Sequence, residues 1–363
     1  MRTLLLTCLL VAIAAPTSAA QPQIPTTTRK VVLERIDTGG HRWKLIPDAP
    51  VPRPTDHQVL VHVRAVSLNR GDLELLEPDP HDLSGRIVAS DAAGDVVAVG
   101  RQVRGVRVGD RVTSTYFRNW TDGPPSREKM SEALGTSVDG VLGDYIVLDD
   151  TSVVPMAAGL TYEEASTLPT AGLTGWMAVA GHRELNKDDV VLVQGTGGVS
   201  TFATQFAAAA GARVIVTSSS DDKLRRAREL GARDGINYRT TPSWSASVLE
   251  LTAGHGADVV VDVGGKRTLE ESLNCLAFWG QLSIVGGLTG YDGQIPAGRL
   301  LGKSARAQGI YVGSRADFAR MRAFIVKHRL HPVIDRVVPL EQFADALKQM
   351  ESGEFVGKIV LRL

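Results

Sequence analysis

The hydrophobic residues follow two different spacings along the chain, and the change predicts two kinds of domain. Between residues 29 and 150, short stretches alternate apolar and polar residues, as in Gln58–Ser67 (QVLVHVRAVS), and glycines and prolines separate them. This spacing is typical of strands with one face in a core. Between residues 189 and 311, runs of consecutive apolar residues alternate with helical stretches, which is typical of a parallel sheet with helices on both faces.

The second region therefore predicts a doubly wound α/β fold. Its first strand, Val190–Val193, is a β-branched run that suits burial on both faces. The further strand candidates are Arg213–Thr217, Asp258–Asp262, Gln281–Val285 and Ala307–Val312. Thr161 and Glu164 have the spacing of a capping box at the start of an earlier helix. After the sheet we expect two amphipathic helices and a final strand, at Asp317–His328, Leu340–Glu351 and Lys358–Leu363.

A glycine-rich turn follows the first strand of this region. Gly195, Gly197 and Gly198 precede an alanine-rich helical stretch, Thr201–Ala210, which Gly211 ends. Glycines at such a turn let the backbone approach a pyrophosphate at the N-terminus of the helix. Ser200 replaces the third glycine of the GxGxxG motif, and a tight turn without a ligand is the alternative interpretation. The strand, turn and helix together favour a dinucleotide site.

The end of the second strand bears on the choice between NAD and NADP. NAD sites usually carry an acidic residue about 20 residues past the first glycine. Here the strand ends in Thr217 and three serines, Ser218 to Ser220, and Lys223 follows within one helical turn. Hydroxyl groups leave room for a 2′-phosphate, and the lysine could pair with it. Asp221 and Asp222 are interpreted as residues of the first helical turn, with Ser220 as N-cap, so NADP(H) is the predicted cofactor.

Length and composition limit the possible classes of protein. A chain of 363 residues predicts two domains, and 43% hydrophobic with 22% charged residues is an ordinary globular composition. Forty basic and 40 acidic residues give no net charge, so there is no overall excess of positive charge to attract nucleic acid or an anionic membrane. The only cysteines are Cys8 and Cys275, which excludes a disulfide framework and a thiolate-rich zinc site.

The first 20 residues have the features of a secretory signal peptide. Arg2 precedes an apolar core, Leu4–Ala15, and small residues lead to an expected cleavage before Gln21, followed by a Pro/Thr-rich spacer over residues 21–28. This predicts a secreted or periplasmic protein with no membrane segment after signal removal. Export conflicts with the predicted cofactor, because little free nicotinamide cofactor is expected outside the cytoplasm. If the signal is not used, the protein would be cytoplasmic.

Several blocks, in their order, resemble the medium-chain dehydrogenase/reductase superfamily on its zinc-independent, quinone-oxidoreductase-like side. The blocks are AVSLNRGDLELL (Ala65–Leu76), DAAGDVVAVG (Asp91–Gly100), VGDRV (Val108–Val112), LPTAGLTGW (Leu168–Trp176), VLVQGTGGVS, TSSSDDKLRRARELGA, INYRT, GIYVGSR and FVGKIVL. The resemblance implies a GroES-like substrate domain, residues 29–155 with 314–363 returning to it, and a Rossmann cofactor domain, residues 156–313. It also implies an active site in the cleft between them, and a homodimer joined near residues 306–312.

The resemblance has consequences for metal and catalysis. Zinc-dependent relatives carry a catalytic Cys and His where this chain has Asn69 and Ser90, so we expect no metal. In quinone- and enone-reducing relatives an NxxD block lines the nicotinamide pocket, often with Tyr after the Asn; here the block is Asn69-Arg70-Gly71-Asp72. We expect Asn69 and Arg70 to orient a carbonyl and stabilise the enolate, with solvent as the proton source. The alternative for Arg70 is an ion pair with Asp72 or another carboxylate.

The resemblance also assigns cofactor residues. Thr174 corresponds to a threonine near the nicotinamide ribose, and Ser218, Lys223 and Tyr238 to positions that hold a 2′-phosphate. The pyrophosphate turn comprises Gly195, Thr196, Gly197, Gly198 and Val199. Loops at the carboxyl ends of strands contribute Gly264, Val285, Gly286 and Tyr311. The alternatives are turn geometry for the glycines and a half-buried aromatic for Tyr238.

The sequence thus predicts a small-molecule enzyme, an NADPH-dependent reductase of quinones, enones or related activated double bonds. A zinc-independent alcohol or aldehyde dehydrogenase is the second interpretation. A binding protein that keeps the fold without turnover is the third, because Ser200 and the signal peptide both depart from a typical reductase. The polar loop over residues 117–137 could shape a substrate mouth or be a solvated surface loop.

Overall fold

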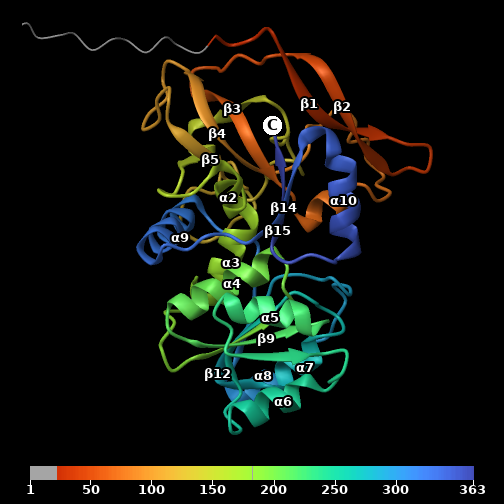
Figure 1. Cartoon of the computed structure of the whole chain (residues 1–363), viewed down its shortest axis with the longest axis vertical. Helices are drawn as coiled ribbons and strands as arrows, with labels where there is room; N and C mark the ends of the chain where they lie inside the picture. Colours follow the sequence, from red (N-terminus) through yellow and green to blue (C-terminus); the bar gives the residue numbers. More distant parts are fainter. Residues whose placement is uncertain (1–22, 182) are drawn as a thin grey trace, which may run out of the picture.

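The computed structural model describes residues 23–181 and 183–363. It has a β-rich part and an α/β part, joined at a waist where segments from the middle and the end of the chain meet (Figure 1). The predicted signal peptide and Cys8 lie outside the described residues. In the part of the chain that is described, no helix has the length and apolar character needed to cross a membrane.

A mixed sheet and a hairpin form the β-rich part. The hairpin pairs β1 with β2, and the seven-stranded sheet has the order β14-β15-β3-β4-β5-β7, with β6 also paired to β3. The strands are β1 (Thr27–Arg35), β2 (His41–Pro50), β3 (Gln58–Ser67), β4 (Asp91–Val99), β5 (Arg111–Ser114), β6 (Tyr145–Asp149), β7 (Val153–Pro155), β14 (Ile334–Pro339) and β15 (Lys358–Arg362).

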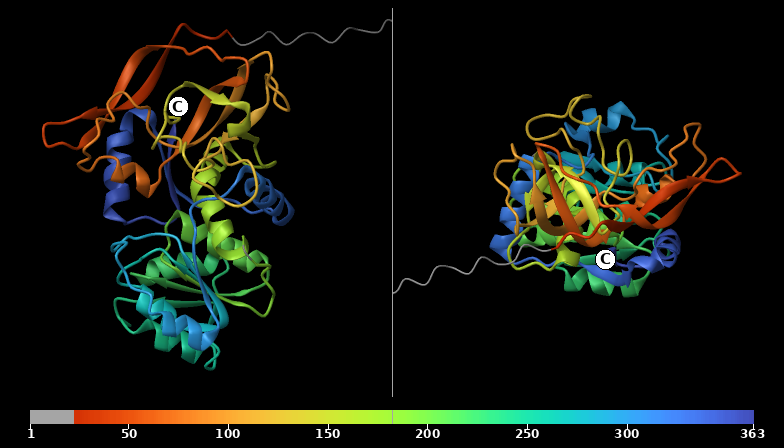
Figure 2. Two further views of the ribbon diagram at one scale, coloured as in Figure 1. Left: turned by 180° about the vertical axis from the view of Figure 1, so that it is seen from behind. Right: turned by 90° about the horizontal axis from the view of Figure 1, so that it is seen from above.

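The end of the chain returns to this sheet. β15 runs antiparallel to β3, with Val360 opposite Ser67, and β14 runs parallel to β15. Figure 2 shows the last segment passing from the α/β part back to the β-rich part. The sequence did not predict β14, because its residues are only half-buried and show no clear alternation. The domain boundaries themselves stay predictions.

The α/β part contains a parallel sheet of six strands in the order β10-β9-β8-β11-β12-β13. This is the 3-2-1-4-5-6 order of doubly wound dinucleotide-binding sheets, so the predicted doubly wound sheet is confirmed. The strands are β8 (Val190–Gln194), β9 (Arg213–Ser218), β10 (Asp234–Asn237), β11 (Ala257–Asp262), β12 (Leu276–Ile284) and β13 (Arg306–Gly309). Every residue of β8 is buried, which fits its unbroken apolar run.

Two strands of this sheet differ from the expected bounds. β12 begins at Leu276 rather than Gln281, and its register shifts against β11 because residues 277–280 bulge from the ladder. Trp279 in this bulge has φ 60° and is 83% exposed, and it belongs to the part of the strand that precedes the expected start. β13 ends at Gly309 rather than Val312; Val312, with φ 59°, belongs to the segment that follows the strand and lines the cavity.

The helices cover both faces of the parallel sheet and the joint between the parts. α4 begins at Gly198, three residues before the predicted Thr201, and Gly211, at φ 91°, follows its end. The capping box of Thr161 and Glu164 starts α2 as expected. The helices are α1 (Arg70–Glu74), α2 (Tyr162–Ser166), α3 (Leu173–Ala180), α4 (Gly198–Ala209), α5 (Asp221–Glu229), α6 (Trp244–Leu251), α7 (Leu269–Asn274), α8 (Ala297–Lys303), α9 (Arg315–His328) and α10 (Phe343–Ser352).

Candidate cofactor and active site

A cavity of about 630 Å³ lies between the two sheets, where the glycine turn of the parallel sheet faces α1 and β15. It brings together all of the site residues predicted from the sequence except Gly264. These are Asn69, Arg70, Thr174, Gly195, Thr196, Gly197, Gly198, Val199, Ser218, Lys223, Tyr238, Val285, Gly286 and Tyr311. The cavity also takes in residues that the sequence analysis did not single out for a role, notably Ser90, Tyr116, Thr170 and Lys358.

The glycine turn has room for a ligand on its cavity side. Gly195 has φ 75°, a conformation that favours glycine, and a Cβ added at Gly197 would meet nothing within 4 Å. The turn leads into α4, a helix of 12 residues, so the free N–H groups of its first turn are close by. The geometry fits a pyrophosphate.

Ser200 does not obstruct this turn. Its hydroxyl is buried and donates to the carbonyl oxygen of Gln194, the last residue of β8, at 2.7 Å. The serine thus bonds back to the strand at the place where it lines the cavity. The departure from the GxGxxG motif is therefore a local substitution that the turn accommodates with a hydrogen bond.

The end of β9 forms a second wall of the cavity. Ser218 is buried, Tyr238 is 43% exposed, and both line the cavity together with Lys223. The Lys223 ammonium donates to the carbonyl oxygen of Gly353 at 2.7 Å, so it links α5 to the segment after α10. Asp221 accepts from the Asn237 amide at 3.0 Å and does not line the cavity.

Gly264 plays a different part from its predicted one. Its N–H donates to the buried carboxylate of Asp262 at 3.0 Å, and an added Cβ would lie 2.4 Å from Thr268. The neighbouring Val263 lines the cavity instead. Turn geometry, the alternative considered for the glycines, therefore accounts for Gly264, and Asp262 is the residue that fixes this turn.

Asn69 stands at the reactive end of the cavity, immediately before α1. Its backbone N–H donates to the Asp72 carboxylate at 2.7 Å, which closes the first turn of the helix. Its side-chain oxygen accepts from the Lys358 ammonium at 2.5 Å, and its Nδ2 lies 3.4 Å from the Ser90 hydroxyl. The amide of Asn69 is thus held from two sides.

A buried carboxylate supports Ser90 from behind. Asp91 is fully buried and accepts from the Ser90 hydroxyl at 2.6 Å and from the Thr170 hydroxyl at 2.6 Å. The Thr170 N–H donates to the same carboxylate at 3.0 Å. Thr170 lies in a π-helical turn, Leu168–Gly172, a distortion that often occurs at functional sites. The sequence contains the LPTAG block, but it gave no reason to expect that Thr170 bonds to Asp91.

Two ionisable groups beneath the site have perturbed pKa values. Burial raises the pKa of Asp72 to about 7, against the opposing effects of the Asn69 N–H and the nearby Lys358 charge. Burial lowers the pKa of Lys358, and the charges of Asp91 and Asp72 oppose that shift. Such shifts are common where a fold serves chemistry.

Arg70 lines the cavity from the first position of α1 and is exposed. No carboxylate is paired with it among the described residues, so the ion pair with Asp72 considered above does not form here. Its guanidinium is available to a ligand in the cavity.

Aromatic and apolar residues form the remaining wall. The Tyr116 and Tyr311 hydroxyls are 3.1 Å apart and connect the β-rich part to the α/β part, and Thr136 lies 3.4 Å from the Tyr116 hydroxyl. Burial raises the pKa of Tyr116, so its hydroxyl stays protonated. Leu134 and Thr136 bring the polar loop over residues 117–137 to the cavity, which favours a substrate mouth over a solvated surface loop, the two interpretations that the sequence left open.

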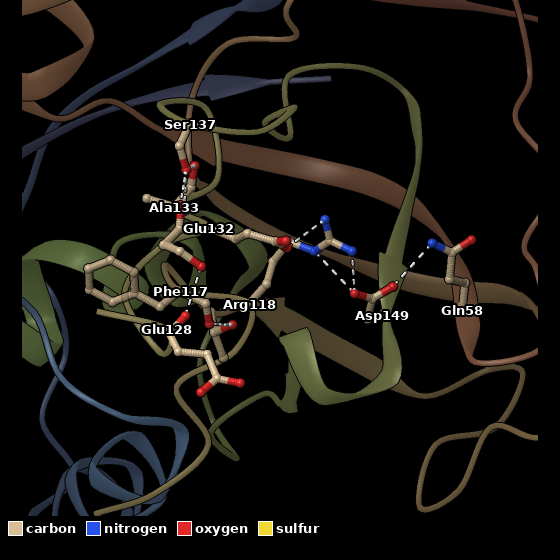
Figure 3. A network of polar contacts seen from close by, with 10 residues as sticks. Gln58, Phe117, Arg118, Glu128, Glu132, Ala133, Ser137 and Asp149 are labelled. Atoms are coloured by element: carbon tan, nitrogen blue, oxygen red, sulfur yellow. Dashed lines mark hydrogen bonds and ion pairs between the residues drawn. The ribbon is translucent and has the colours of Figure 1, made fainter. Parts of the chain in front are cut away.

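One arginine anchors this loop to the sheet. Arg118 pairs with Glu132 across the loop at 3.0 Å and with Asp149 at the end of β6 (Figure 3). Gln58 at the start of β3 donates to the same carboxylate at 3.1 Å. The loop is therefore tied to the sheet at its base, while Leu134 and Thr136 reach the cavity.

The positions considered for zinc carry an amide and a hydroxyl. Asn69 and Ser90 contact each other as described, and among residues 23–181 and 183–363 no group of three or more His, Cys, Asp or Glu side chains could hold a metal ion.

Comparison with known proteins agrees with this architecture. Residues 55–158 match the alcohol dehydrogenase GroES-like domain, and residues 198–327 match the zinc-binding dehydrogenase family. A zinc-type alcohol dehydrogenase-like protein of Schizosaccharomyces pombe is 42% identical over 316 residues, which cover 84% of this chain and 91% of that protein. The chain belongs to the medium-chain dehydrogenase/reductase superfamily.

Further members of the superfamily include reductases and dehydrogenases. A quinone oxidoreductase of Pseudomonas aeruginosa is 35% identical over 248 residues, 67% of this chain and 68% of that protein. A crystal structure provisionally described as an alcohol dehydrogenase of Sinorhizobium meliloti 1021 is 39% identical, has a TM-score of 0.87, and is covered in full by 94% of this chain. The GroES-like and Rossmann fold is confirmed, and the protein is an oxidoreductase of this superfamily with a nicotinamide dinucleotide cofactor.

Proposed function

We propose that this superfamily member is an NADPH-dependent reductase that acts on a quinone, an enone or a related activated double bond without a metal. One observation carries the proposal: a single cavity joins the glycine turn and the Ser218–Lys223 wall to the Asn69 amide. The quinone oxidoreductase among the relatives supports the substrate class.

The cofactor residues divide the cavity into two ends. Gly195 to Val199 would hold the pyrophosphate at the start of α4, and Thr174 would contact the nicotinamide ribose. Ser218, Lys223 and Tyr238 would surround a 2′-phosphate. To reach it, the Lys223 ammonium has to leave the Gly353 carbonyl, or donate to the carbonyl and the phosphate at the same time. When bound, the nicotinamide supplies a hydride.

The other end would stabilise charge on the substrate oxygen. The Asn69 amide donates hydrogen bonds, and Arg70 adds a permanent positive charge that no carboxylate of residues 23–181 or 183–363 pairs with. Neither residue supplies a proton readily, so the carbon that becomes basic takes its proton from solvent. Asn69 and Ser90 lack the thiolate and imidazole of the zinc site, which is why we expect activity to survive chelation.

The first experiment is a fluorescence titration of the purified protein with NADPH and, separately, with NADH. Tight binding of NADPH and weak binding of NADH is expected. Steady-state reduction of a set of quinones and enones follows, with and without prior treatment by a chelator. Oxidation of alcohols instead of reduction would favour the dehydrogenase interpretation, and failure to bind either cofactor would favour a binding protein.

We also propose a homodimer formed along the open edge of the parallel sheet. β13 is the last strand in the order of that sheet, and Phe278 and Trp279 are exposed at 71% and 83% in the neighbouring β12. Sedimentation should give about twice the chain mass of 38.8 kDa, and a monomer at micromolar concentration would contradict the proposal.

Export by the signal peptide stays a prediction. N-terminal sequencing of the protein from its natural source would show whether the chain begins at Gln21.

A further inference from the structure

Lys358 is a buried lysine that neither the sequence analysis nor the proposed chemistry assigns a role. It begins β15, is 4% exposed, and lines the cavity next to the glycine turn. Its ammonium donates to the carbonyl oxygen of Leu68 at 2.5 Å and to the side-chain oxygen of Asn69 at 2.5 Å. Both acceptors belong to the segment that leads into α1.

The fold makes room for this side chain. A Cβ added at Gly198 would lie 2.5 Å from the Cδ of Lys358, so the methylene stem passes directly over the glycine turn. The backbone beside it is fixed as well, because the Gly357 N–H donates to the carbonyl oxygen of Thr196 at 2.9 Å. The lysine therefore reaches Asn69 from a well-held backbone, through space that a glycine leaves open.

Packing alone does not require a charge at this position. Burying an ammonium is unfavourable unless its charge is compensated, and an apolar side chain of similar length commonly does as well or better in such a place. Asp72 and Asp91 influence Lys358 through their charges, yet neither forms an ion pair with it in the described part of the chain. The hydrogen bonds of the ammonium go to Leu68 and Asn69 instead.

These contacts determine which way the Asn69 amide faces. A lysine ammonium only donates hydrogen bonds, so the atom of the amide that faces it has to be the oxygen. The NH2 group then lies on the opposite side, where the Ser90 hydroxyl is 3.4 Å away. Since that hydroxyl already gives its proton to Asp91 at 2.6 Å, it can only accept from the amide.

We propose that Lys358 is a positioning residue that locks the Asn69 carboxamide with its NH2 group as the donor available to a substrate oxygen. The inference rests on the proposed function for the identity of the group that Asn69 contacts. Ser90 holds one N–H of the amide, and the second N–H remains for the ligand. Without the ammonium the amide loses the contact that holds its oxygen, and the longer contact of its NH2 group with Ser90, at 3.4 Å, opposes rotation less strongly. In the rotated amide the oxygen would repel the developing negative charge.

The test compares three variants of the full chain. Lys358→Met removes the charge and keeps the stem, and Lys358→Arg keeps a donor. Lys303→Met is the matched control, because Lys303 also donates to backbone carbonyls, those of Leu273, Asn274 and Leu276, but does not line the cavity. Protein labelled with ¹⁵N-asparagine reports the side-chain amide of Asn69, whose signals are identified by their loss in Asn69→Asp.

The expected result separates the positioning role from a structural one. Lys358→Met should shift the Asn69 side-chain signals and lower kcat by about tenfold or more, with KM and the Kd for NADPH changed less than about twofold. Lys358→Arg should restore part of kcat, and Lys303→Met should match the unmodified protein. If Lys358→Met does not fold, Lys358→Arg takes its place in the comparison with the unmodified protein. Shifted Asn69 signals together with a lower kcat would then support the positioning role, and a lower kcat with unchanged signals would overturn it.

Other outcomes have distinct meanings. Unchanged Asn69 signals in Lys358→Met, or a large loss of NADPH binding without a change in those signals, would overturn the positioning role. If the unmodified protein reduces no quinone or enone, the proposed function fails, and the Asn69 signals alone still decide whether Lys358 positions the amide.

Discussion

Gly198 and Lys358 are 160 positions apart in the sequence, and the Lys358 side chain occupies the space that the missing side chain of Gly198 leaves open. A methyl group at Gly198 would lie 2.5 Å from the Lys358 Cδ and 3.2 Å from the Cβ of Ala171. In the proposed function the glycine turn would hold a pyrophosphate. It also leaves the space through which the lysine reaches Asn69.

This relationship makes a prediction for two neighbouring glycines. Gly198→Ala should lower the free energy of unfolding of the cofactor-free protein by about 1–3 kcal/mol, because the methyl group displaces a buried stem. Gly197→Ala is the matched control, since its Cβ would meet nothing within 4 Å and its φ of −74° suits any residue. It should change stability by about 0.5 kcal/mol or less. Urea denaturation measures both, and equal losses would show that the lysine stem is not the cause.

Lys223 gives a prediction for cofactor choice. Lys223→Met should raise the Kd for NADPH by about tenfold or more and leave the Kd for NADH within about twofold, because only the 2′-phosphate gains from the charge. Arg225→Met is the control, as Arg225 lies on the same helix, pairs with Asp222 and does not line the cavity. A parallel loss for both cofactors would mean that the contact with Gly353, not the phosphate, is what Lys223 supplies.

Asp72 predicts a pH-dependent difference in stability. Its pKa is 3.8 in a model peptide and about 7 in the fold, so the folded state holds an extra proton between these values. Its contribution to stability is full below about pH 4 and is lost as the pH rises to about 7. The Asn69 N–H, Asp91 and Lys358 are the groups that act on it.

Asp72→Asn lacks this titration and keeps an acceptor for the Asn69 N–H. From pH 5 to pH 8 the stability of the variant should rise relative to the unmodified protein by about 2 kcal/mol. Chemical denaturation at both pH values measures the difference. Stability curves that stay parallel over this range would show that Asp72 is ionised in the fold throughout.

The sequence predicted most of the fold because the informative segments are short and strongly patterned. Val190–Gln194 is apolar at four positions in a row and is followed by glycines, a pattern that a buried strand leading into a tight turn explains best. β10 and β14 were not predicted, because their residues are partly polar and their strand character comes from pairing with β9 and β15.

Part of the cofactor end of the cavity was predictable for a similar reason, because Ser218 and Lys223 lie at and just after the end of the patterned strand β9. Tyr238 follows β10 and was assigned only through the family resemblance. The polar network at the reactive end was not. Lys358 lies near the C-terminus and Thr170 near the middle of the chain. Only the fold brings Lys358 within hydrogen-bond distance of the Asn69 amide and Thr170 within hydrogen-bond distance of the Asp91 carboxylate. A buried lysine in an alternating strand looks, in the sequence, like an exposed one.

Removal of the Arg70 guanidinium should affect turnover but not the stability of the fold. The Arg70 side chain lines the cavity and no carboxylate is paired with it in the described part of the chain, so removing it should not weaken the fold. If the guanidinium stabilises an oxyanion, Arg70→Ala lowers kcat for a quinone or enone by about 10- to 100-fold while the free energy of unfolding changes by about 0.5 kcal/mol or less. Arg101→Ala is the control, because Arg101 is exposed, pairs with Asp56 and lies outside the cavity. Turnover that survives in Arg70→Ala would leave Asn69, held by Lys358 and Ser90, as the sole donor to the substrate oxygen in the proposed reaction.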